Sequence, residues 1–123
     1  MEAPSPARLY AAAAGALLFC CGLLGFFYDA SFSALDDLQP AYGVLEVNAW
    51  INLLYIVTGA LGILLAGVAS RRCSLAIGLL YTLLGIFALG ATGFHLVIGL
   101  LGLAAVAGTP SLKPRAKPAR ERA

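Results

Sequence analysis

Apolar residues run almost without interruption through four stretches of this chain, and polar residues gather between them. The stretches lie at about 9–27, 49–68, 74–89 and 94–107. Each approaches the roughly 20 residues that an apolar helix needs to cross a bilayer core about 30 Å thick. The pattern therefore predicts an all-α membrane protein with four transmembrane helices, joined on the exterior side by the loop 28–48 and by a short turn.

The last two stretches are short for membrane spans. The turn signal between them is "GATG" at 90–93, which leaves about 16 residues for each helix, or roughly 24 Å. A locally thin bilayer, longer helices or a re-entrant hairpin would each accommodate this length. The first stretch exceeds the ~7–15 apolar residues of a signal peptide and lacks a cleavage site before the acidic loop, so we interpret it as a span.

The chain also resembles itself at two fixed offsets. Both halves are therefore interpreted as one helical hairpin used twice, with extra residues inserted into the loop of the first. Two repeats with an even number of spans share one orientation in the membrane. The identical positions are Val57/Val97, Gly59/Gly99, Leu61/Leu101 and Gly62/Gly102 at one offset, and Gly15/Gly78 and Gly22/Gly85 at the other.

Composition and charge agree with a membrane location. The chain is 61% hydrophobic and 11% charged, which leaves too few polar groups for a water-soluble surface. Its eight basic residues lie on one side of the four-span arrangement: Arg8, Arg71, Arg72 and the tail 108–123. The loop 28–48 has only acidic charges. The positive-inside rule then predicts a multi-pass protein of the cell inner membrane with both termini cytoplasmic.

Two segments lie outside the predicted spans. The basic, proline-rich tail 108–123 has too few apolar residues to fold, so it is predicted to be disordered and attracted to anionic lipid headgroups. It has no interleaved aromatic residues, and nucleic acid is not expected as a partner. In the loop, Ser33 and Asp36 predict a short capped surface helix that ends before Pro40.

A stripe of polar and small residues marks one face of the second stretch, and a shorter stripe marks the fourth. Helices in lipid associate through close packing and interhelical hydrogen bonds. We therefore predict that the small residues admit a neighbouring helix and that the asparagine amides bond to it. The first stripe is Asn48, Asn52, Tyr55, Gly59 and Gly62, and the second is His95, Gly99 and Gly102.

Tyr55 and His95 occupy equivalent positions in the two halves. They are expected to face each other near the exterior end of the bundle and to share a hydrogen bond worth roughly 0.6 kcal/mol. The alternative is a functional site, since an imidazole in a membrane could ligate haem or another metal or handle ions. His95 is the only histidine, so bis-histidine ligation would require two copies of the chain.

Other reactive side chains form no recognisable site. The cysteines are odd in number and lie at or inside predicted spans, so structural disulfides are not expected. The loop carboxylates match no calcium-binding pattern, and they are the only candidates for an enzyme acting on lipids. We predict no enzyme activity, no cofactor and no metal site. The residues concerned are Cys20, Cys21, Cys73, Asp29, Asp36, Asp37 and Glu46.

The segments "YGVLEVNAWINLLYIVTGALGILLA" (42–66) and "FHLVIGLLGL" (94–103) resemble a family of small four-helix bacterial membrane proteins classed only as a domain of unknown function. The family pattern is Val-Asn, then Asn-x-x-His-x-x-x-Gly-x-x-Gly, with a second His-x-x-x-Gly in the fourth helix. The resemblance extends over about 8–107, and Tyr55 stands where the family usually has histidine. It implies the four-helix fold and no activity.

Together these features predict a small integral membrane protein that is a structural or accessory subunit of a membrane assembly. The alternative is a cofactor-binding or ion-handling protein centred on His95. The paired glycines exceed what one small bundle needs, which predicts contacts with another membrane protein or a second copy. These pairs are Gly15/Gly22, Gly59/Gly62, Gly78/Gly85 and Gly99/Gly102.

Overall fold

Four helices make up most of the fold, as predicted, and a small sheet joins the first two. The computed structural model describes residues 3–32, 34, 37–42, 45–87 and 92–110. The sheet is a β-hairpin that the sequence pattern did not predict. The elements are α1 (Pro6–Gly25), β1 (Gln39–Ala41), β2 (Leu45–Val47), α2 (Ala49–Leu65), α3 (Ser70–Ile86) and α4 (Thr92–Ala107).

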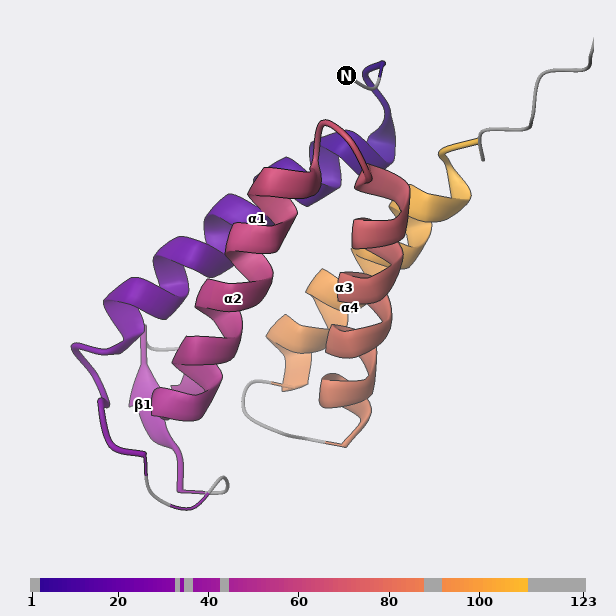
Figure 1. The fold of residues 1–123 in the computed structure, drawn as a ribbon. Coiled ribbons are helices and arrows are strands. Elements are labelled where there is room, and N and C mark those ends of the chain that lie inside the picture. Colours follow the sequence, from indigo (N-terminus) through magenta and orange to yellow (C-terminus); the bar gives the residue numbers. More distant parts are fainter. Residues whose placement is uncertain (1–2, 33, 35–36, 43–44, 88–91, 111–123) are drawn as a thin grey trace, which may run out of the picture.

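The helices are arranged as two pairs. α1 packs along α2, α3 packs along α4, and contacts between the pairs are fewer. The pairs meet near the N-terminus and the α2–α3 turn, here called the terminal end, and they diverge toward the end that carries the β-hairpin, here called the hairpin end (Figure 1). Each pair is therefore the packing unit of the fold.

Equivalent glycines bring the backbones together in both pairs. A Cβ atom on Gly15 would lie 2.8 Å from the Gly59 carbonyl oxygen, and one on Gly78 would lie 3.1 Å from the Gly99 oxygen. An added Cβ would force a shift at Gly15 and would crowd the backbone at Gly78, so close backbone approach depends on glycine. The two sequence offsets also relate Gly15–Ile63 to Gly78–Leu103, Gly22–Ile56 to Gly85–Leu96, and Gly59–Phe19 to Gly99–Thr82.

All eight paired glycines contact another helix of the same chain. Each helix pair therefore uses four glycines in one continuous contact. The contact with another membrane protein or a second copy stays a prediction.

Two helices begin earlier than the hydrophobic pattern indicated. α1 starts at Pro6 because the Ser5 hydroxyl accepts a hydrogen bond from the Arg8 amide at 3.1 Å, and proline suits the first helical position. α3 starts at Ser70, so Arg71 and Arg72 belong to its first turn rather than to a connection. Arginine is a good helix former, and only its charge ends the apolar pattern.

The loop between α1 and α2 contains a strand pair where a surface helix was expected. The predicted capping residues Ser33 and Asp36 lie outside the described residues, and the expected stop at Pro40 falls inside β1. Pro40 pairs with Glu46 in an antiparallel register, with the buried Ala41 and Val47 close by. An edge strand of a two-stranded sheet tolerates proline, because the missing amide is not needed for pairing.

Tyr42 fixes this hairpin to α1. Its φ angle of 55° places it in the left-handed region, which a bulky residue rarely adopts. Its hydroxyl donates to the Cys21 carbonyl oxygen at 2.6 Å, and its ring lies 4.9 Å from that of Tyr28. Burial, followed by nearby Cys21 and Tyr28, raises the pKa of Tyr42, so the hydroxyl remains a donor.

A set of hydrogen bonds closes the terminal end. The Ala7 amide donates to the Thr109 hydroxyl at 2.9 Å, and the Ser74 hydroxyl donates to the Ala7 carbonyl at 2.9 Å. Thr109 also donates to Ala105 at 2.8 Å, and Arg71 Nε donates to the Thr109 carbonyl at 3.2 Å. These bonds satisfy helix-end groups that would otherwise lack partners, and they join α1, α3 and the end of α4.

We expect Thr109→Val to destabilise the fold by about 1–3 kcal/mol, because the buried Ala7 amide would lose its acceptor. The measurement is the unfolding free energy in mixed micelles of mild detergent and dodecyl sulfate. Thr109→Ser retains the hydroxyl and should stay close to the parent. Equal losses in the two variants would contradict a role for the hydroxyl.

Candidate functional site

A buried polar cluster lies between the two helix pairs. Tyr55 on α2 and His95 on α4 are both fully buried, and the Tyr55 hydroxyl lies 2.7 Å from His95 Nε2. The donor in this hydrogen bond depends on the histidine tautomer. The two positions are equivalent under the internal repeat, and the contact expected between them is observed.

Two residues that the sequence did not single out complete the cluster. The hydroxyls of Thr58 and Tyr81 lie 2.7 Å apart, and Thr58 donates to the Leu54 carbonyl oxygen at 2.8 Å. Since the Thr58 proton is used there, Tyr81 donates to Thr58. The Tyr81 ring centroid lies 5.6 Å from that of His95. Tyr81 superposes on Leu18 in the first half, so the repeat gave no sign of it.

The bonding of this cluster suits a structural role. The hydroxyls of Tyr55, Thr58 and Tyr81 each reach another side chain, and Nε2 of His95 is engaged by Tyr55. A haem iron or metal ion at that nitrogen would have to displace the phenol. Within the described ranges, no three histidine, cysteine or acidic side chains gather in a way that would hold a metal ion. These hydrogen bonds join α2 to α3 and α4.

The two asparagines bond differently from our expectation. Asn48 caps α2 by accepting from the Ile51 amide at 2.9 Å, and its Nδ2 lies 3.5 Å from the Ala34 carbonyl oxygen. Asn52 donates to the Asp29 carbonyl oxygen at 3.1 Å. The Asn52 amide therefore bonds to the segment after α1 rather than to a neighbouring helix. α1 reaches the level of Asn52, where its last residue, Gly25, lies against the Asn52 side chain, but the loop after α1 supplies the carbonyl groups.

The rest of the predicted stripes forms the helix contacts. Gly59 and Gly62 face α1, Gly99 faces α3, and Gly102 lies against both α3 and the Tyr10 side chain of α1. The stripe on α2, including Asn48, Asn52 and Tyr55, is buried along its whole length. One face of α2 therefore holds the loop at the hairpin end, the polar cluster in the middle and a backbone contact toward the terminal end.

We expect Asn52→Ala to loosen the segment after α1. The variant loses the bond to Asp29, which should cost about 1 kcal/mol, and amide hydrogen exchange at 29–32 should accelerate. Leu53→Ala changes the adjacent, partly exposed side chain and is the matched control. Unchanged exchange in Asn52→Ala would show that the hairpin alone orders this segment.

The chain can now be compared with known proteins. Residues 8–94 match the model of a family described as "Domain of unknown function (DUF4383)". The chain belongs to this family. The DUF4383 match includes α1, the β-hairpin, α2 and α3 and ends at Phe94, one residue before His95. The chain matches no curated protein and no solved structure.

Proposed function

We propose that this DUF4383 chain is a four-span inner-membrane protein, with both termini cytoplasmic, that serves as a structural or accessory subunit of a membrane assembly. The observation that supports it best is the distribution of side chains, which partly reverses that of a water-soluble bundle. The interior contains polar residues such as Asn52, Thr58 and His95 among small apolar ones, and many large apolar residues are exposed on the outside.

α2 illustrates this reversal. Its buried positions include Asn52, Tyr55 and Thr58, whereas Leu64 is 73% exposed and Val57 is 49% exposed. In water, such a surface would drive aggregation or association. In lipid, apolar side chains face acyl chains at no cost, and polar groups are best placed between helices. Further exposed residues are Leu79, Leu83 and Ile86 on α3, and Val97, Leu100 and Leu101 on α4.

Helix length is the main constraint on this proposal. Among the described helices, α1 alone is both long and apolar enough to cross a membrane, and Ala49–Leu65 and Gly93–Ala107 are apolar but shorter. At 1.5 Å per residue the shorter helices extend roughly 24–26 Å. Local bilayer thinning can accommodate them, and Arg71 and Arg72 can extend from the first turn of α3 to the interface.

Aromatic residues at the hairpin end support a membrane interface at that end. Phe27 is 88% exposed. Phe32 and Trp50 form an edge-to-face pair with ring centroids 4.9 Å apart. Such rings favour the headgroup region of a bilayer. In the proposed arrangement they mark the exterior interface, while the terminal end lies at the cytoplasmic interface.

Topology can be tested by labelling single cysteines in intact cells with a membrane-impermeant maleimide. In a background with Cys20, Cys21 and Cys73 replaced by alanine, Asp37→Cys should be labelled from outside. Ser5→Cys should react only after the membrane is opened. Labelling of both positions in intact cells, or of neither before opening, would contradict four spans with cytoplasmic termini.

The accessory role is tested by purification from the native membrane in a gentle detergent. We expect a colourless protein, because Tyr55 already engages Nε2 of His95, and we expect it to carry other chains in fixed proportion. A visible absorption band that disappears in His95→Ala would contradict this role and establish the cofactor alternative. Absence of any co-purifying chain would leave no support for a subunit of an assembly.

A further inference from the structure

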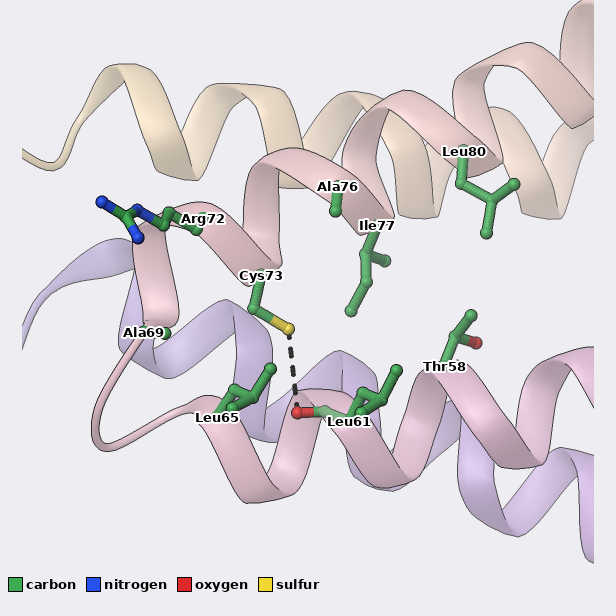
Figure 2. Close-up of a pocket in the computed structure, with 9 residues that line it drawn as sticks. All are labelled: Thr58, Leu61, Leu65, Ala69, Arg72, Cys73, Ala76, Ile77 and Leu80. Atoms are coloured by element: carbon green, nitrogen blue, oxygen red, sulfur yellow. Dashed lines mark hydrogen bonds between the residues drawn. The ribbon is translucent and has the colours of Figure 1, made fainter.

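An apolar groove runs between α2 and α3 on the outside of the bundle. It has a volume of about 450 Å³, within the range of roughly 300–1,000 Å³ typical of small-molecule sites. Figure 2 shows Leu61 and Leu65 of α2 pointing toward Cys73 and Ile77 of α3. The groove exists because α2 and α3 belong to different helix pairs and lack the glycine contacts that close each pair.

One end of the groove is cationic. Arg72 lines it beside Ala69, next to the α2–α3 turn (Figure 2). The first turn of α3 contains two arginines and no acidic residue, and the cap residue Ala69 makes no side-chain hydrogen bond to it. A helix N-terminus carries a partial positive charge that adds to that of an adjacent arginine.

We propose that this groove binds an anionic phospholipid, with one acyl chain between α2 and α3 and the phosphate at Arg72 and the start of α3. The inference rests on the proposed membrane insertion. Insertion places the apolar part of the groove within the bilayer core and Arg72 at the headgroup level. A chain of methylene groups matches the apolar walls, and the phosphate matches the charge at the end.

The charge also favours a lipid over a helix from a second copy. An apolar helix seated along the groove would cover Arg72 without supplying a counter-charge, and burial of an unpaired guanidinium is unfavourable. A phospholipid supplies the counter-charge from the same molecule that fills the groove. The occupant is therefore expected to be one lipid for each chain.

The test uses the full chain reconstituted in vesicles of phosphatidylcholine with a minor fraction of phosphatidylglycerol. After solubilisation, native mass spectrometry counts the lipids that remain on the protein. We expect one retained phosphatidylglycerol for each chain. Arg72→Ala should lower its retention about fivefold, the effect expected for one basic residue at an anionic surface. Ala76→Leu should lower retention similarly by filling the groove without changing charge.

Two variants are matched controls. Arg8→Ala removes a charge at the same end but outside the groove, and Ala13→Leu enlarges an exposed alanine on α1. Both should retain phosphatidylglycerol as the parent does, and every variant keeps the basic tail.

Equal retention of the two lipids, or an effect of Arg72→Ala without one of Ala76→Leu, would overturn the groove as the binding site. A second chain cross-linked at Ala76 through an introduced cysteine would overturn it as well. Alkaline carbonate extraction distinguishes failure of the groove proposal from failure of the proposed membrane insertion. A chain released by carbonate is not inserted, whereas an inserted chain without lipid preference contradicts the groove alone.

Discussion

Gly59→Ala is expected to destabilise the protein by at least about 3 kcal/mol, because the added methyl group would meet backbone rather than a movable side chain. Its Cβ would lie 2.6 Å from the Gly15 carbonyl oxygen and would also press on the Phe19 amide. Relief requires α1 and α2 to separate along their contact. The unfolding free energy in mixed micelles measures this loss.

The repeat supplies a second test of the same contact. Gly99→Ala would place a methyl group against the Thr82 backbone, in the position equivalent to Phe19, so a similar loss is expected. Gly93→Ala is the control, since nothing lies within 4 Å of the added atom. Because alanine favours helix more than glycine does, this control should be neutral or slightly stabilising. Tolerance of Gly59→Ala would contradict backbone contact between the helices.

His95→Ala is expected to cost about 2–4 kcal/mol. It leaves a cavity between the helix pairs and a buried Tyr55 hydroxyl without its partner. Tyr55→Phe keeps the ring packing and removes only the hydrogen bond, so its loss should be nearer 1 kcal/mol. Unfolding free energies of the single and double variants measure both effects.

A double-mutant cycle of these two substitutions isolates their interaction. For a hydrogen bond between membrane helices, the coupling is expected at about 0.6 kcal/mol and at most about 1.7 kcal/mol. A coupling indistinguishable from zero would contradict the assignment of this pair to stability. Val97→Ala, an exposed change on the same helix, should show no coupling to Tyr55→Phe.

The sequence determined the four helices and their equivalence. Hydrophobic runs predicted four helices, since apolar stretches of this length have few other ways to satisfy the backbone. The match of Gly15 to Gly78 and of Gly59 to Gly99 predicted that one hairpin geometry occurs twice. Equivalent glycines make equivalent backbone contacts in both halves. The equivalence of Tyr55 and His95 also predicted the contact between them. Local pattern and internal comparison are enough to predict a contact when both partners belong to the repeat.

Tertiary structure decided the features that depend on non-repeated partners. The Tyr81 hydroxyl bonds to Thr58, and the Thr109 hydroxyl accepts from the Ala7 amide. No sequence pattern relates the residues in either bond. Asn52 lies against Gly25 at the end of α1 and bonds to the Asp29 carbonyl because the chain turns back over it after the helix. The groove beside Arg72 likewise arises from the spacing of α2 and α3. Hydrogen-bond partners and cavities are set by the packing of whole helix pairs, and that information is distributed over the chain.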